Sequence, residues 1–227
     1  MIAFFKKISA SLFFITMLVF IIAGAIQNET LQIITKPLLI PILMLLVWVS
    51  TPRSSSRNIM LVALFFSFLG DVFLLFESKR PSLFIPGLVC FLLTHILYII
   101  YFLSIRPSQK SILKTAPYLI PLVAGYGLLL LSVLFPHLGD LKIPVAIDAV
   151  VIMSMLLASM HIYNRVIPRV GMLFITGAIF FVLSDSLLAI NKFYLPLGNF
   201  SFLVMVTYCT AQWLIVMGFI KNRIQES

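Results

Sequence analysis

The sequence consists almost entirely of apolar runs of about 20 residues, separated by short groups of charged residues, prolines and glycines. A run of this length spans the hydrocarbon core of a bilayer as an α-helix. Of the 227 residues, 62% are hydrophobic and only 10% are charged, which leaves too little polar surface to cover a water-soluble globule. The chain is therefore predicted to be all-α, a polytopic transmembrane helical bundle.

About eight spanning helices are predicted, in a single transmembrane domain over residues 1–227. The apolar runs place them at about residues 8–26, 31–50, 58–76, 83–104, 112–135, 141–162, 170–190 and 197–220. No soluble domain fits between them, because the loops are short throughout. The first run leaves an alternative open, since Lys6 and Lys7 before it and Ala23-Gly24-Ala25 near its end are also typical of a cleaved signal peptide. The length of the run favours a retained helix.

The distribution of Lys and Arg predicts the orientation of the chain. Eleven of these 16 residues fall at the two termini and in the loops at 51–57, 105–114 and 163–169, and five fall on the other side. Because cytoplasmic loops carry the excess of basic residues, both termini are expected in the cytoplasm, in a bacterial inner membrane. The net charge of +9 then reflects orientation and not nucleic-acid binding. Cys90 and Cys209 lie in apolar runs and predict neither a disulfide nor a metal site.

Three aspartates, Asp71, Asp148 and Asp185, lie inside predicted spans, in the half of the bilayer away from the cytoplasm. An aspartate at the centre of a spanning helix costs roughly 2.5–3.5 kcal/mol on insertion scales, so acids kept there are candidates for function. Other polar residues lie nearby in depth, on the second, fourth and eighth predicted helices: Lys36, His95, Tyr98, Tyr208 and Gln212. One polar cavity that opens away from the cytoplasm would satisfy all of these groups.

The segments around Asp71 and Asp185 share one pattern, FFSFLGDVFLL and FFVLSDSLLAI. An offset of 114 residues equates the third and fourth predicted helices with the seventh and eighth, and places Tyr98 opposite Gln212. Two parallel four-helix repeats, related by an axis along the membrane normal, would bring the two aspartates together. Matches of Phe and Leu arise easily by chance in such a composition, so the repeat is a hypothesis.

Five segments, in order and over nearly the whole chain, resemble the YhhN family of membrane proteins, whose animal members are lysoplasmalogenases. They are TKPLLIPILML at 35–45, SFLGDVFLL at 67–75, PGLVCFLLTHILY at 86–98, GAIFFVLSDSLLA at 177–189 and YCTAQWLIVMG at 208–218. Each motif alone is weak, whereas five in register are specific. Asp148 departs from the family pattern, in which a tyrosine is expected, so no family role is transferred to it.

The resemblance implies hydrolysis of the vinyl-ether bond of a lysoplasmalogen, with release of a fatty aldehyde and glycerophospho-ethanolamine or glycerophospho-choline. It implies no metal and no cofactor. The expected partners are the lysophospholipid substrate and membrane lipids, with no nucleic acid, and the sequence does not define an oligomeric state.

Vinyl-ether hydrolysis suits a pair of carboxyl groups. An acid protonates the carbon β to the ether oxygen, and water then captures the resulting oxocarbenium ion, so one carboxyl group must be protonated and the other ionised. Burial raises the pKa of a carboxyl group, and a second carboxylate nearby raises the pKa of one member of the pair further. One carboxyl group can therefore stay protonated while the other is ionised, without a metal. We expect Asp71 and Asp185 to be the catalytic pair, with Asp71 as the acid because its neighbours are more apolar. Ser184 and Ser186 are expected to hydrogen-bond Asp185 or the water.

The predicted substrate-binding residues are Lys36, His95, Tyr98, Ser184, Ser186, Tyr208 and Gln212. Structural roles are the alternative for several of them. Lys36 can extend to the headgroup layer from the end of its helix. His95 can pack against a neighbouring helix, and the tyrosines and Gln212 can form interhelical hydrogen bonds.

Two other classes of membrane protein compete with this interpretation. A zinc-dependent intramembrane hydrolase needs several histidine ligands, and only His95 lies well inside a span. A proton-coupled transporter of small molecules or lipids could use the same carboxylates. Such transporters usually have paired helix breaks, and Pro117 and Pro121 interrupt the fifth predicted helix without a matching break in the first. A purely structural bundle would leave the buried acids unexplained.

Overall fold

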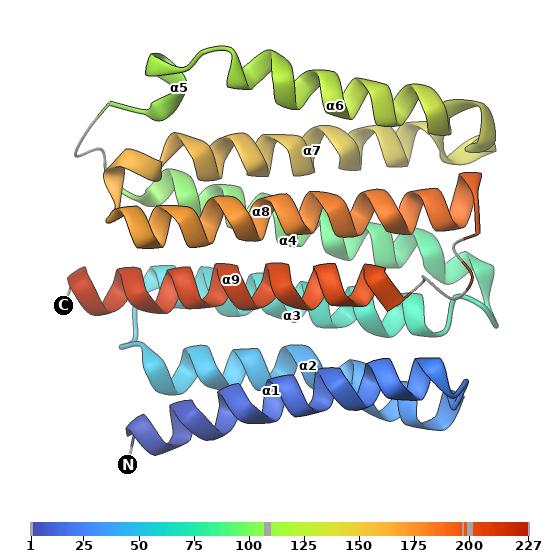
Figure 1. The fold of residues 1–227 in the computed structure, drawn as a ribbon, viewed down its shortest axis with the longest axis horizontal. Helices are drawn as coiled ribbons and strands as arrows, with labels where there is room; N and C mark the ends of the chain where they lie inside the picture. Colours follow the sequence, from blue (N-terminus) through green and yellow to red (C-terminus); the bar gives the residue numbers. More distant parts are fainter. Residues whose placement is uncertain (1, 107–109, 197, 199–201, 227) are drawn as a thin grey trace. The chain divides into compact units, whose positions relative to one another are not determined.

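The computed structural model describes residues 2–106, 110–196, 198 and 202–226, and these residues form helices and no strand. Eight of the helical segments are long and apolar enough to cross a membrane. The long helices are α1 (Ile2–Ala25), α2 (Glu29–Ser50), α3 (Ser55–Leu75), α4 (Phe84–Ser104), α6 (Leu119–Leu134), α7 (Lys142–His161), α8 (Pro168–Ala189) and α9 (Phe202–Glu226) (Figure 1). The predicted class is confirmed: the chain is a multi-pass, all-α membrane protein.

One helix differs from the prediction. The fifth predicted span, 112–135, is not continuous, because it consists of the short helix α5 (Ile112–Thr115) followed by α6. Pro117 disfavours the helical conformation in the residue before it, and Ala116 has φ −130° and ψ 67°. The eighth predicted span begins at 197, a position outside the described residues, and its described helix begins at Phe202.

Contacts divide the chain into two compact units, Met1–Tyr98 and Ile99–Ser227. In the first unit α1 packs along α2, and α2 packs along α3. The turn between α1 and α2 is closed by the backbone N–H of Asn28, which donates to the Ala23 carbonyl over 2.8 Å. The Asn28 side chain then caps α2 by accepting from the Leu31 amide over 3.0 Å. This tight turn brings the end of α1 and the start of α2 together.

Small and hydroxylated residues bring α4 close to α3 in the first unit. The Thr94 hydroxyl donates to the Ala63 carbonyl over 3.1 Å and accepts from the Ser67 hydroxyl over 3.2 Å. A Cβ atom on Gly70 would lie 2.7 Å from the ring of Phe91, so only glycine permits this approach without rearrangement. Hydrogen bonds and close backbone packing of this kind hold helices together in a bilayer, where apolar burial provides little driving force.

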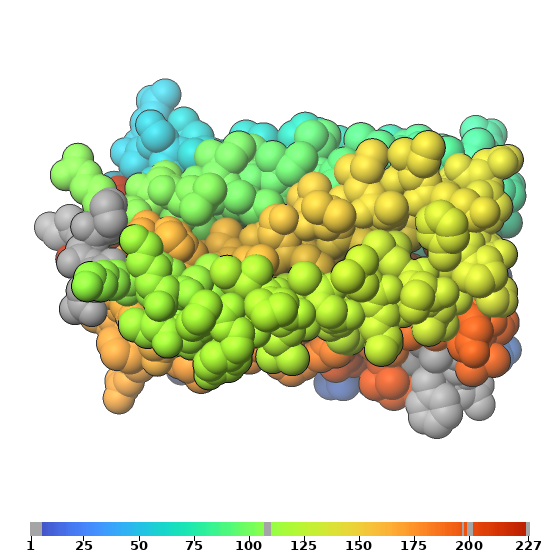
Figure 2. Space-filling model, turned by 90° about the horizontal axis from the view of Figure 1, so that it is seen from above, coloured from blue at the N-terminus to red at the C-terminus, as the bar shows by residue number. Residues whose placement is uncertain are grey.

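In the second unit α6 packs on α7, α7 on α8, and α8 on α9. Figure 2 shows α6 covering one face of this unit with α7 beside it. Leu128 and Leu129 of α6 are 68% and 64% exposed, as suits a surface that faces lipid. The close α8–α9 contact depends on Gly177, where a Cβ atom would lie 2.8 Å from the Ile215 side chain and 3.2 Å from the Ala211 carbonyl oxygen.

The offset of 114 residues also relates contacts within the two units. It carries Ser67 and Thr94, which are hydrogen-bonded between α3 and α4, onto Phe181 and Tyr208. The latter two rings meet between α8 and α9, with centroids 5.6 Å apart in an edge-to-face arrangement. The same register of two helices therefore recurs in both units. The internal repeat remains a hypothesis, which this correspondence supports.

The close packing at Gly177 predicts a clear effect of a larger side chain. Gly177→Leu should destabilise the second unit by about 1–3 kcal/mol, because the added atoms overlap the backbone and side chains of α9. Gly125→Leu is the matched control, since a Cβ atom on Gly125 meets nothing within 4 Å. Thermal unfolding in detergent measures the difference, and equal midpoints for the two variants would contradict this account of the α8–α9 interface.

Candidate active site

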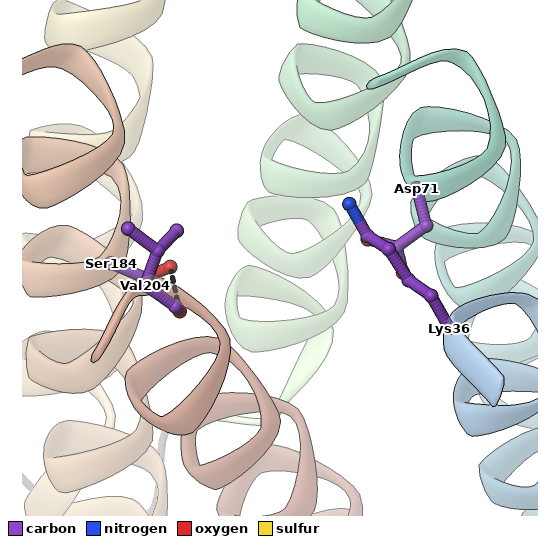
Figure 3. Close-up of polar contacts among 4 residues, drawn as sticks. All are labelled: Lys36, Asp71, Ser184 and Val204. Carbon is purple, nitrogen blue, oxygen red and sulfur yellow. Dashed lines mark hydrogen bonds and ion pairs between the residues drawn. The ribbon is translucent and has the colours of Figure 1, made fainter. Parts of the chain in front are cut away.

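An ion pair lies inside the first unit, between Lys36 of α2 and Asp71 of α3. The Lys36 Nζ atom is 3.9 Å from the Asp71 Oδ1 atom, and the side chains are 13% and 3% exposed. Figure 3 shows the two side chains reaching toward one another from their helices. This contact gives Lys36 a partner inside the unit and argues against simple extension of its side chain toward the headgroups. The attraction between the charges also offsets part of the cost of burying each of them.

The residues next to the ion pair change the backbone hydrogen bonding of α2 and the packing of α3. Pro37 follows Lys36 and has no N–H, so α2 lacks its usual donor to the carbonyl of Ile33. Gly70 precedes Asp71 and allows the Phe91 ring to lie against α3. The carboxylate therefore comes from a helix segment that is packed closely against its neighbour, which restricts its position.

His95 and Tyr98 lie on α4, and both are fully buried. They belong to the same unit as the ion pair, within four residues of the Thr94 hydroxyl that joins α4 to α3. The structure thus places the predicted polar residues of the first unit, Lys36, Asp71, His95 and Tyr98, in the interior of membrane-spanning helices.

Asp185 lies on α8 in the second unit and is half-buried. The serines on either side of Asp185 in the sequence hydrogen-bond backbone carbonyls of the same unit. The Ser184 hydroxyl donates to the Val204 carbonyl over 3.0 Å (Figure 3). The Ser186 hydroxyl donates to the Val182 carbonyl over 2.7 Å. The predicted hydrogen bonds of these serines to Asp185 or to the water therefore remain a prediction.

Tyr126 was not identified from the sequence. It lies on α6, and its hydroxyl donates to the Ser186 hydroxyl over 2.8 Å. The only sign of this role is a tyrosine within a leucine-rich run, and tyrosines are common at membrane interfaces for other reasons. The contact holds α6 against the part of α8 that carries Asp185.

The remaining predicted residues of the second unit lie on α9. Tyr208 is 3% exposed with its ring against Phe181, and Gln212 is fully buried. Asp148, for which no family role was expected, is buried on α7. Within the described residues, no group of three or more His, Cys, Asp or Glu residues lies close enough together to hold a metal ion.

Eight apolar helices with charged and polar groups in their interior define a polytopic membrane protein with an intramembrane polar site. The model of the YhhN family matches residues 31–219, and the chain belongs to this family. The family resemblance read from the sequence is confirmed.

Curated relatives of the chain carry one activity in their names. The chain is 31% identical to lysoplasmalogenase TMEM86B of Homo sapiens, over 79% of the chain and 71% of the relative. It is 30% identical to lysoplasmalogenase TMEM86A of Bos taurus, over 71% of the chain and 65% of the relative. It is 32% identical to the lysoplasmalogenase of Mycobacterium tuberculosis, over 77% of the chain and 65% of the relative. No solved structure matches the chain significantly.

The ion pair predicts an energetic coupling between its two members. In a double-mutant cycle of Lys36→Met and Asp71→Asn, we expect a coupling energy of about 1 kcal/mol or more, because each single change leaves one buried polar group without its counterpart. Thermal unfolding in detergent measures it. Lys79→Met combined with Asp71→Asn is the control, since Lys79 is exposed, and it should give additive effects. Additivity for Lys36 and Asp71 as well would show that the pair does not stabilise the fold.

Proposed function

We propose that this protein is an intramembrane hydrolase of the lysoplasmalogenase type. It cleaves the vinyl-ether bond of a lysoplasmalogen to a fatty aldehyde and glycerophospho-ethanolamine or glycerophospho-choline. Membership of the YhhN family and three relatives named as lysoplasmalogenases, at about 30% identity over most of the chain, support this activity. The substrate is a lysophospholipid, which reaches the site from the membrane.

The observation that carries the proposal is the buried pair of Lys36 and Asp71. A charged pair inside apolar helices is expensive to maintain, and a structural bundle has no need of it. Vinyl-ether hydrolysis, in contrast, requires groups that exchange protons with the substrate and with water. Lys36 has three N–H donors, so its ammonium group can contact Asp71 and a polar group of the substrate together.

The formation of the hemiacetal needs two proton transfers. A carboxylic acid donates a proton to the carbon β to the ether oxygen, and the double bond supplies the electron pair for the new C–H bond. The resulting oxocarbenium ion is attacked by water, whose proton passes to a carboxylate. The hemiacetal hydroxyl then loses its proton as the aldehyde forms and the bond to the glycerol oxygen breaks, and that oxygen takes up a proton and leaves as a hydroxyl. We assign these two roles to Asp71 and Asp185.

The ion pair bears on which aspartate has which role. An ammonium group beside a carboxyl group stabilises the ionised form over the neutral acid, and Lys36 lies beside Asp71. We therefore assign the water-activating role to Asp71 and the proton-donating role to Asp185, the reverse of the assignment based on apolar neighbours. His95, Tyr98, Tyr208 and Gln212 are proposed to bind the substrate, because they are polar and buried within spanning helices.

The proposed orientation places both termini in the cytoplasm of a bacterial inner-membrane protein. It rests on the excess of Lys and Arg, eleven against five, at the termini and on the loops of one side. In this orientation Lys36 and Asp71 lie in the half of the membrane away from the cytoplasm. The substrate headgroup then enters from the non-cytoplasmic leaflet.

The mechanism predicts large effects of conservative changes. Asp71→Asn and Asp185→Asn should each lower the release of fatty aldehyde from a lysoplasmalogen by two or more orders of magnitude, roughly the scale for general acid–base groups. Asp140→Asn is the matched control, because Asp140 is exposed between α6 and α7. Product analysis by mass spectrometry on the purified variants, with unfolding midpoints measured in parallel, tests the prediction. Substantial activity in either folded variant would remove that aspartate from the mechanism.

The orientation is tested with two exposed serines at opposite ends of α3. In a chain whose Cys90 and Cys209 are replaced by alanine, Ser78→Cys should react with a membrane-impermeant thiol reagent added outside intact cells, and Ser55→Cys should not. Both should react after the membrane is permeabilised. Labelling of Ser55→Cys alone in intact cells would invert the topology and place the site in the cytoplasmic leaflet.

A further inference from the structure

A cavity of about 460 Å³ opens in the first unit, where α1 turns into α2 and where α3 ends. Both places lie at the same end of the unit (Figure 1). Its volume falls in the range of about 300–1,000 Å³ that is typical of small-molecule sites. Its lining includes polar and apolar residues from the turn, from the first turns of α2 and from the end of α3 and the segment after it: Gln27, Glu29, Gln32, Ile33, Leu75 and Lys79.

The cavity lies next to the ion pair along both helices. Ile33 precedes Lys36 by three residues on α2, and Leu75 follows Asp71 by four residues on α3. Residues three and four apart share a helix face one turn apart, about 5.4 Å along the axis. The cavity therefore continues the face of α2 and α3 that carries Lys36 and Asp71. A ligand that fills it reaches to within about one helical turn of the proposed catalytic carboxylate.

The charges of the cavity suit a ligand that carries both signs. Glu29, at the start of α2, lines the cavity with a carboxylate, and Lys79, in the segment after α3, lines it with an ammonium group. Pro37 removes the intrahelical donor to the carbonyl of Ile33, which is a lining residue. A carbonyl without its intrahelical donor can accept a hydrogen bond from an ammonium group. One part of the cavity thus favours a cation, and Lys79 favours an anion.

The turn that ends α1 brings a long amide side chain to the cavity. Gln27 lines the cavity with φ at +53°, a left-handed conformation that glycine or asparagine normally occupies at a helix C-terminus. The backbone N–H groups of Gln27 and Asn28 donate to the carbonyls of Gly24 and Ala23, which is the Schellman arrangement that ends a helix. The residue in the left-handed position of this turn is therefore a polar one that lines the cavity.

We infer that this cavity is the headgroup subsite of the hydrolase and that it binds a zwitterionic glycerophospho-amine headgroup. Lys79 holds the phosphate, Glu29 and the carbonyl of Ile33 hold the ammonium end, and the Gln27 amide contacts the headgroup. The bound headgroup positions the glycerol chain so that the ether bond extends toward Asp71. The inference rests on the proposed function and adds to it the place and the residues of headgroup binding.

Three variants test the subsite without changing the proposed acid or base: Glu29→Gln, Lys79→Gln and Gln27→Gly. The last retains the turn, because glycine readily adopts positive φ. Arg80→Gln is the control, since Arg80 is the exposed neighbour of Lys79 and is not among the described lining residues. Each protein is assayed on a 1-alkenyl-glycerophosphoethanolamine and on the headgroup-free 1-alkenylglycerol.

The ratio of kcat/KM for the phosphoethanolamine substrate to kcat/KM for the alkenylglycerol should fall about tenfold in the Glu29 and Lys79 variants, since each loses one charge-assisted contact. It should fall by a smaller factor in Gln27→Gly and stay at the wild-type value in Arg80→Gln. An unchanged ratio in the Glu29 and Lys79 variants of an active enzyme overturns the subsite and leaves the hydrolase standing.

A binding measurement separates failure of the subsite from failure of the proposed function. Calorimetric titration of the purified protein with soluble glycerophosphoethanolamine should show binding that weakens about tenfold in Glu29→Gln and in Lys79→Gln. That result supports the subsite even if no vinyl ether is cleaved, in which case the hydrolase proposal alone fails. Absence of binding to the wild type, or equal binding to all variants, overturns the subsite.

Discussion

The fold and the proposed chemistry of the first unit both depend on a pair of charges kept inside apolar helices. The attraction between Lys36 and Asp71 is stronger in a medium of low dielectric constant than in water, and each charge makes the burial of the other less costly. The pair requires that α2 and α3 approach closely at one end of the first unit, and the packing of α2 along α3 provides this approach. The fold of this unit and its chemistry are therefore linked at a single contact.

The same end of the unit carries both the charges and an opening to a polar cavity. A lysophospholipid has a charged headgroup at one end and an apolar chain at the other, and the spanning helices offer surfaces of both kinds. In the proposed mechanism, polar binding at the headgroup leaves the reacting bond among buried groups, where proton transfer is not in competition with bulk water. The substrate class and the depth of the carboxylate thus have one physical explanation.

The sequence predicted the spanning helices well because length and apolarity alone decide which segments cross a bilayer. It predicted the interior position of Asp71 for the same reason. The break at Ala116 was visible only as Pro117, whose effect on a helix depends on whether neighbouring groups satisfy the backbone. Contacts between helices could not be predicted, because the pairing of Lys36 with Asp71 and of Tyr126 with Ser186 depends on helix rotation and packing.

Hydrolysis in D₂O tests most directly the claim that the enzyme works by protonating a vinyl ether. Purified protein is incubated with a 1-alkenyl-lysophospholipid and, separately, with the 1-acyl analogue, and the aldehyde is reduced at once so that later exchange does not add label. We predict a fatty aldehyde with one deuterium on the carbon next to the carbonyl, because that carbon receives the proton from the acid, and no fatty acid from the acyl analogue. Release of fatty acid from the acyl analogue, or an aldehyde without deuterium at that carbon, would contradict the mechanism.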